Sequence, residues 1–262
     1  MVLIQVFLIA FGASVIGGIC GIGGGVIIKP LMDLFDIAGV AEVSFMSACT
    51  VFSMTLFNVG KSFTDDNSGI ELKTTFPLSA GAAAGGVVGS KCFAAVCVLL
   101  SQRVAGLMQA LSLMVLTFGT LLYTLLKRNI RTKDVRKKSS CLIIGLLLGL
   151  LSSFLGIGGG PFNIAVLHYF FSMDTKTAVI NSLFVILISQ GANLGSVIIG
   201  GSIPTLPVMP LIFMIAGGIV GGIIGRNLNK KMEAKTIDKL FLLLMAVIIG
   251  ICAFNAGGYV RQ

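Results

Sequence analysis

The stretch GIGGG at residues 21–25 decides how this chain is organised, because the same five letters return at residues 156–160. Each copy separates two apolar segments, and the segments that follow, 26–35 and 161–171, are too short to cross a bilayer untilted. Glycine breaks a helix and frees backbone groups that lipid cannot satisfy. The repeated stretch therefore predicts two helical hairpins, each broken at its glycines and lining a cavity within the membrane.

The spacing of 135 residues between the two copies also aligns polar residues. It pairs Ser47 with Ser182 and Asn58 with Asn193. With one inserted residue, GGVVG from residue 85 falls on GGIIG from residue 221, which predicts seams of small residues where helices pack closely. The chain therefore consists of two related halves. We expect a first transmembrane repeat at 1–126, a basic cytoplasmic linker at 127–140 and a second transmembrane repeat at 141–262.

The composition places the chain in the membrane. Hydrophobic residues make up 56% of it, charged residues only 11%, and the mean hydropathy is +1.02, whereas a soluble domain carries roughly 25% charged residues. The net charge of +9 resides in short loops between apolar runs, so it indicates membrane topology and not nucleic-acid binding. The sequence predicts an all-α polytopic membrane protein.

The cysteines and the single histidine do not form a metal-binding pattern. The six cysteines are scattered, mostly in apolar stretches, and GIGGG lacks the strand and downstream acid of a dinucleotide loop. We therefore expect no metal, no cofactor and no catalytic residues. Cys92 and Cys97 could pair on an oxidising side, although burial as hydrophobic side chains is favoured. The first 20 residues lack a basic region and a cleavage site, and are interpreted as a retained membrane segment.

The distribution of basic residues predicts how the two halves are oriented. Seven of them lie in the linker, which places it in the cytoplasm, and the 226–239 loop is basic too. Both loops are cytoplasmic if 141–171 is a hairpin and two full spans follow it. The first half then has the opposite orientation, with fifteen of the 19 basic residues inside. We expect two inverted-topology repeats, each with a glycine-broken helical hairpin plus three spanning helices, and extracytoplasmic termini in the cell membrane.

A substrate site is expected where the two broken hairpins meet. Inverted-repeat transporters hold anions at the bilayer midplane with the N-terminal ends of half-helices and with bare amide groups. The helix after each hairpin adds hydroxyl and amide side chains, which complete a neutral polar lining. For each residue the alternative is structural, as a close helix crossing or an interhelical hydrogen bond. The candidate substrate-binding residues are Gly21, Gly23, Gly24, Gly25, Ser47, Asn58, Gly156, Gly158, Gly159, Gly160, Asn181, Ser182, Gln190 and Asn193.

No carboxylate or arginine lies at the centre of a predicted span, and Lys29 and His168 are the nearest candidates for a charged group. Lys29 follows the first glycine stretch and could attract an anion, but a lysine there more often extends to the interface. His168 titrates in a useful range, yet a lone histidine on an apolar segment is more often a packing residue. Neither is included among the candidate site residues.

Taken together, these features resemble the sulfite exporter TauE/SafE family over nearly the whole chain. The features that carry the resemblance are the two GIGGG copies, Pro30 after the first copy, the helices that contain Ser47 and Ser182, and the two GGxxG segments. The resemblance implies a two-fold repeated membrane protein that moves sulfur-containing anions such as sulfite and organosulfonates. It assigns the family's glycine and serine pattern to residues 21–25 with Ser47 and to 156–160 with Ser182.

The two half-sites are expected to differ. Pro161 and Ala165 follow the second glycine stretch where the first has Pro30, and Met46 aligns with Asn181.

The predicted function is secondary transport of a small sulfur-containing anion by alternating access, and an anion channel with the same glycine-lined site is the alternative. A membrane-embedded enzyme would need a nucleophile with a base, and one histidine without a GxSxG segment does not supply them. A purely structural subunit would not need a paired motif. The expected partners are the anion and membrane lipid; the coupling ion, the direction of transport and assembly into a homo-oligomer stay open.

Overall fold

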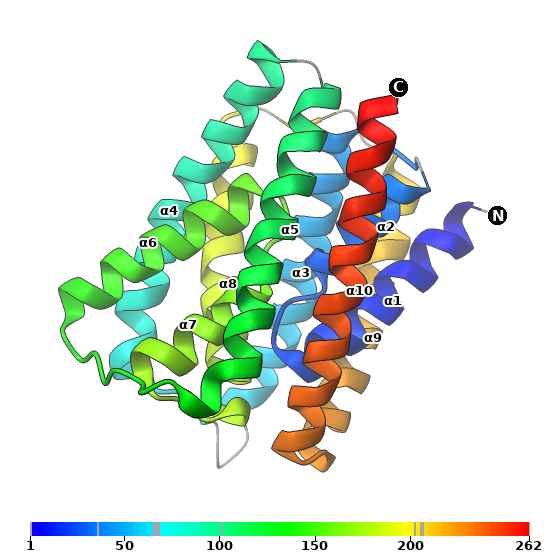
Figure 1. Ribbon diagram of the computed structural model, residues 1–262. Helices are drawn as coiled ribbons and strands as arrows, with labels where there is room; N and C mark the ends of the chain where they lie inside the picture. Colours follow the sequence, from blue (N-terminus) through cyan, green and yellow to red (C-terminus); the bar gives the residue numbers. More distant parts are fainter. Residues whose placement is uncertain are drawn as a thin grey trace.

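The computed structural model describes residues 2–35, 37–64, 69–100, 102–201, 203–204 and 207–261. Within these residues the chain forms ten α-helices and no strand (Figure 1). A single 3-10 turn, η1 (Lys127–Asn129), follows the fifth helix. The helices are α1 (Val2–Cys20), α2 (Gly25–Leu34), α3 (Val40–Phe63), α4 (Leu72–Leu99), α5 (Gln102–Leu126), α6 (Lys138–Phe154), α7 (Pro161–Phe171), α8 (Thr175–Ile199), α9 (Val208–Lys231) and α10 (Ala234–Arg261).

Seven helices of the described chain are long and apolar enough to cross a membrane, namely α1, α3, α4, α5, α8, α9 and α10. The short helices α2 and α7, which follow the two glycine stretches, have 10 and 11 residues. The helix α6, which precedes the second glycine stretch, has 17. The all-helical membrane class predicted from composition is therefore confirmed. The two short helices after the glycines also match the expected broken hairpins.

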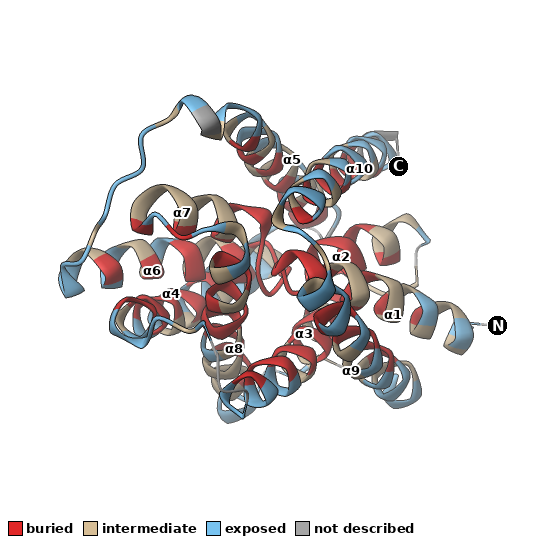
Figure 2. Ribbon diagram, turned by 90° about the horizontal axis from the view of Figure 1, so that it is seen from below, coloured by how far each residue is buried: buried red, intermediate tan, exposed pale blue. Residues whose placement is uncertain are grey.

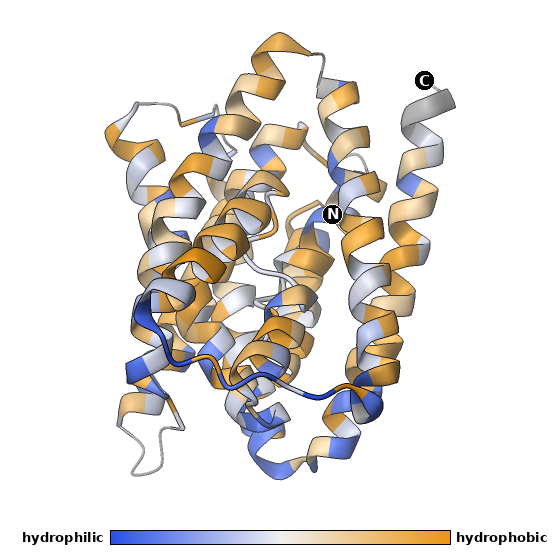
Figure 3. Cartoon of the chain, turned by 60° about the vertical axis from the view of Figure 1, so that its left-hand side comes forward, coloured by the Kyte–Doolittle hydropathy of each residue, from blue (hydrophilic) through white to orange (hydrophobic). Residues whose placement is uncertain are grey.

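The outer surface of the bundle is apolar. Large hydrophobic side chains such as Val115, Leu243 and Phe254 are exposed on the outer helices, while buried residues gather on α2, α3 and α8 (Figure 2). Hydrophilic residues concentrate at one end of the molecule, which includes the segment between α5 and α6 (Figure 3). We call this end the linker end and the opposite one the far end. A belt of exposed hydrophobic side chains suits contact with lipid acyl chains.

The glycine seams bring helices into backbone contact. A methyl group built at Gly85 would overlap the carbonyl oxygen of Leu146, so α4 lies directly on α6. In the second half, a methyl group at Gly225 would overlap the carbonyl oxygen of Val15, so α9 lies directly on α1. Both predicted seams are thus found where close helix approach requires a missing side chain.

Packing partners correspond between the two halves. As α4 packs on α6 and α8, so α9 packs on α1 and α3; as α2 packs on α3 and α10, so α7 packs on α8 and α5. The remaining large contacts, α3 with α8 and α5 with α10, join equivalent helices of the two halves. Each half therefore completes its packing with helices of the other.

One expectation about a loop was wrong. The 226–239 loop is mostly helical, because α9 continues to Lys231 and α10 begins at Ala234. Arg226, assigned to that loop, is buried on α9. Hydropathy marks where a helix leaves the apolar region, whereas arginine, leucine and lysine, as in residues 226–231, let it continue beyond that point. The last residues of the predicted linker, from Lys138, are helical and form the first turn of α6.

The linker is held against the second hairpin. The backbone N–H groups of Lys133 and Val135 donate to the carbonyls of Tyr169 and Phe170 at 2.7 and 2.8 Å. Near the same end, Lys127 pairs with Asp238 at 2.6 Å and ties the end of α5 to the start of α10. The thiols of Cys92 and Cys97 are both free, so the alternative disulfide is not formed.

Candidate functional site

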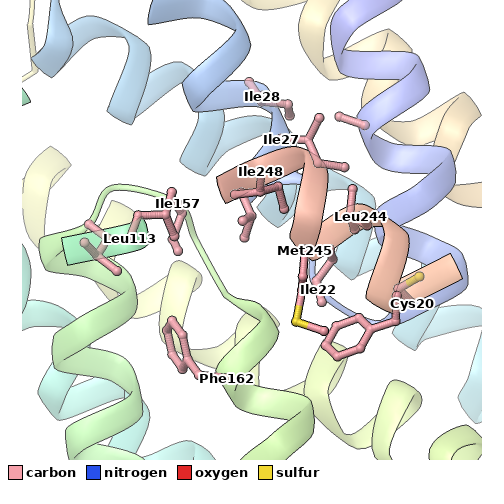
Figure 4. Close-up of a cluster of buried hydrophobic side chains, with 14 of the residues drawn as sticks. Cys20, Ile22, Ile27, Ile28, Leu113, Ile157, Phe162, Leu244, Met245 and Ile248 are labelled. Atoms are coloured by element: carbon pink, nitrogen blue, oxygen red, sulfur yellow. The ribbon is translucent and has the colours of Figure 1, made fainter. Parts of the chain in front are cut away.

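Two glycine turns meet at the centre of the molecule. The φ angles of Gly23 and Gly158 are 78° and 69°, in the left-handed region that favours glycine. A methyl group built at Gly25 would overlap the carbonyl oxygen of Ile157, so the turns touch backbone to backbone. Ile22 and Ile157, the second residues of the two stretches, are fully buried in the hydrophobic cluster of Figure 4. The predicted meeting of the two broken hairpins is observed.

The two equivalent serines behave differently. The Ser182 hydroxyl donates to the carbonyl of Gly21 at 2.6 Å and so fixes the first turn from the opposite half. The Ser47 hydroxyl is buried beside Gly25 and makes no hydrogen bond within the described residues. Buried polar atoms without partners are rare in proteins, and water or a ligand commonly satisfies them. Ser47 is thus available to a ligand, whereas Ser182 holds the turn.

A cavity of about 320 Å³ opens beside the second turn at the far end; we call it the far-end cavity. It lies between α3, α4, α6 and α8, and Gly156 and Gly158 form part of its wall. Ser153, Gln190 and Asn193 also line it, and each has a buried polar atom without a hydrogen-bond partner in the described chain. For Gln190 both the amide nitrogen and the amide oxygen lack such a partner. The arrangement offers several unused donors and acceptors at one place.

A second cavity, of about 200 Å³, lies at the linker end. Its lining corresponds to that of the far-end cavity when the repeat spacing is applied: Val179 replaces Ser44, Leu183 replaces Ala48 and Ser62 replaces Val197. The chemistry differs, because this linker-end cavity is lined by the basic side chains of Lys176, Arg226 and Lys230. The molecule therefore holds two equivalent hollows, one toward each end of the bundle.

An apolar barrier separates the two cavities. Along α8, residues up to Leu183 line the linker-end cavity, and residues from Gln190 onward line the far-end cavity. The intervening six residues rise about 9 Å in an α-helix. Val51 and Ile186, which are spaced by the repeat distance, are both buried there and both contact the space beside Gly23. At this level the two aliphatic side chains close the path between the cavities.

The other candidate residues lie near the centre with different roles. Asn181 lines neither cavity, and its amide is fully engaged: it accepts from Thr75 Oγ1 at 2.5 Å and from the Glu71 N–H at 2.9 Å. It also donates to the carbonyls of Gly69 and Thr177. The structure thus gives Asn181 a packing role between α8 and the start of α4.

Asn58 occupies the position equivalent to Asn193, one helical turn before Ser62 of the linker-end cavity. It is fully buried, and both of its amide atoms lack hydrogen-bond partners in the described chain. The remaining glycines form the turns themselves and are absent from the linings of the cavities. They are Gly21, Gly23, Gly24, Gly25, Gly159 and Gly160.

Lys29 was misjudged from sequence. Its side chain does not extend to an interface; only 3% of the residue is exposed, and its ammonium donates to Ser44 Oγ and Gln109 Oε1. Gln109 is 80 residues away, so nothing in the local sequence indicates this partner. His168, by contrast, is a packing residue as favoured, with Nδ1 2.9 Å from the Tyr123 hydroxyl.

The seven apolar spans define a multi-pass membrane protein. The model of the family "Sulfite exporter TauE/SafE" matches residues 6–251, so the chain belongs to this family of membrane transporters. A curated relative, "Probable membrane transporter protein YunE" of Bacillus subtilis (strain 168), is 28% identical over 105 residues. That match covers 40% of this chain and 37% of the relative. No solved structure matches the chain.

Proposed function

We propose that the protein is a secondary transporter that moves a small sulfur-containing anion, sulfite or an organosulfonate, across the cell membrane by alternating access. One observation carries the mechanism. Two equivalent cavities lie at opposite ends of the bundle, and the paired glycine turns and the Val51–Ile186 barrier lie between them. A solute held at the turns can then be exposed to one cavity at a time. The family supplies the substrate class.

The proposal includes inverted repeats. In its support, α3, α4 and α5 run in directions opposite to those of α8, α9 and α10 (Figure 1), and the packing partners of the halves correspond. The basic linker lies at the end that carries most hydrophilic residues (Figure 3). By the excess of basic residues in cytoplasmic loops, this end faces the cytoplasm. The far-end cavity and both termini then face outward.

The site is suited to an oxyanion because it offers several separate donors. Among the described residues, the amide of Gln190 and the hydroxyls of Ser153 and Ser47 are buried and have no hydrogen-bond partner. Gln190 and Ser153 line the far-end cavity, and Ser47 lies beside Gly25. A hydrogen bond to a charged group contributes about 1.5–3 kcal/mol, and several such bonds offset the cost of removing water from the anion. The three oxygens of sulfite or a sulfonate can each accept one, whereas chloride presents a single centre.

The channel alternative requires a continuous path through the molecule. Channels select ions in filters of carbonyl or charged groups that stay open to both sides. Here the two cavities are separated by the buried side chains of Val51 and Ile186. This arrangement favours a transporter.

Flux measured in proteoliposomes tests the proposal. Purified protein is expected to take up radiolabelled sulfite or a small sulfonate with saturation in the micromolar to millimolar range, and excess chloride should compete weakly. Liposomes without protein provide the control. Flux that rises linearly with concentration would support a channel instead, and transport of chloride alone would exclude a site built for sulfur oxyanions.

A further inference from the structure

Lys29 lies directly behind the wall of the far-end cavity. Its Nζ is 2.6 Å from Ser44 Oγ, and it would lie 3.1 Å from a methyl group built at Gly156. It also lies 5.4 Å from the centre of the Phe93 ring. Ser44, Phe93 and Gly156 all line the far-end cavity. A positive charge from the first half is therefore next to the glycine turn of the second half.

The two hydrogen-bond partners of this ammonium are neutral and oriented to hold a cation, and the Asp33 carboxylate lies near it in a small pocket that both residues line. Gln109 Nε2 donates to the carbonyl of Phe154 at 2.8 Å, which leaves Oε1 to face Lys29. The Ser44 hydroxyl donates to the carbonyl of Val40 at 2.7 Å, so its lone pairs face Lys29 too. A buried charge within membrane helices is costly, and retained ones commonly serve the solute pathway. This cation has an organised pocket on one side and the cavity on the other.

We propose that Lys29 is the anion-binding charge of the far-end cavity, an inference that rests on the proposed transport function. An anion that reaches Gly156 displaces the Ser44 hydroxyl from the ammonium and accepts a hydrogen bond from Nζ. Gln109 continues to hold the side chain in place. The equivalent position in the second half is Ile164, so the charge belongs to one half-site only. The anion therefore binds off-centre, beside the second turn and Gln190.

Two lysines near the far-end cavity have different roles. A neutral polar lining alone would hold neutral solutes as well as anions, whereas a buried ammonium selects for negative charge. The exposed Lys91 also lines this cavity, at the end of α4 nearer to solvent. Lys91 can attract anions to the opening, but a solvated charge contributes little binding energy.

The test compares Lys29→Met, which removes the charge at nearly constant volume, with Lys29→Arg and with Lys91→Met as the matched control. Sulfite affinity is measured on purified monodisperse protein by calorimetric titration, and KM and maximal rate are measured in proteoliposomes. Loss of a charge-assisted hydrogen bond should weaken sulfite binding roughly tenfold or more in Lys29→Met. Lys29→Arg should recover part of the affinity. Lys91→Met should change it by less than roughly twofold.

Unchanged sulfite affinity in folded Lys29→Met would overturn the inference and make the lysine a packing residue. If Lys29→Met does not fold, Ser44→Ala decides: removal of the competing acceptor should leave affinity equal or higher, and a tenfold loss would show that the hydroxyl binds the anion. Sulfate and a sulfonate are titrated in parallel. A wild-type protein that binds another anion but not sulfite would refute the proposed substrate, and the Lys29 comparison would then be made with that anion.

Discussion

Gly25→Ala is expected to reduce sulfite transport to background while folded protein still accumulates in the membrane. The added methyl group would overlap the carbonyl oxygen of Ile157, where the two glycine turns touch. Backbone cannot repack as a side chain can, so the turns must separate. Overpacking of this kind typically costs about 1–3 kcal/mol, which a folded protein can survive. A site assembled from both turns does not survive their separation.

Gly85→Ala provides the matched control. Its methyl group would also overlap a carbonyl oxygen of a neighbouring helix, that of Leu146, but in the seam between α4 and α6. We expect a lower thermal midpoint with normal transport per folded molecule. Size-exclusion chromatography gives the folded fraction, and radiolabelled uptake gives the rate. Equal transport per folded molecule in the two variants would mean that the glycine turns serve packing alone.

Gln190→Leu is expected to lower sulfite affinity roughly tenfold or more, because the variant removes a donor to a charged ligand. Leucine has a similar volume, and the lost amide has no hydrogen-bond partner among the described residues. Burial of an unsatisfied amide is unfavourable, so the thermal midpoint should stay equal or rise. Calorimetric titration and thermal unfolding of the same sample separate the two effects.

Asn181→Leu, on the same helix, should behave in the opposite way. Three of the four hydrogen bonds of the Asn181 amide tie α8 to residues 69–75 at the start of α4, and their loss leaves buried partners such as Thr75 Oγ1 unsatisfied. Stability should fall, and sulfite affinity of the surviving protein should not. If Gln190→Leu binds sulfite as tightly as the wild type, the far-end cavity is not the binding site.

Much of the fold could be predicted because its signals are local. The apolar runs, the two glycine stretches and the two GGxxG segments are each continuous in sequence, and the repeat spacing relates them. The site was harder, because its distinctions depend on distant partners. Asn181 and Gln190 look alike in sequence, but the Asn181 amide bonds to Glu71, directly before α4, and to Thr75 on α4, whereas the Gln190 amide has no partner among the described residues.

The burial of Lys29 was not predicted, for the same reason. Lys29 appeared to lie near the end of a short helix, where a lysine normally reaches the interface. Gln109 and Ser44 instead hold it inside, across contacts that no spacing rule indicates. The equivalence of the two cavities, by contrast, follows from the repeat spacing once α3 and α8 are known to cross.

The central claim is that the two cavities open in turn to opposite sides of the membrane, and cysteine accessibility tests it most directly. Ser196 lines the far-end cavity and Thr177 the linker-end cavity. Each is replaced by cysteine in a chain whose six native cysteines are removed. An impermeant maleimide should label Ser196→Cys only from outside and Thr177→Cys only from inside, and saturating sulfite should change the two rates in opposite directions. Labelling of both positions from one side, or parallel changes in both rates, would contradict the account.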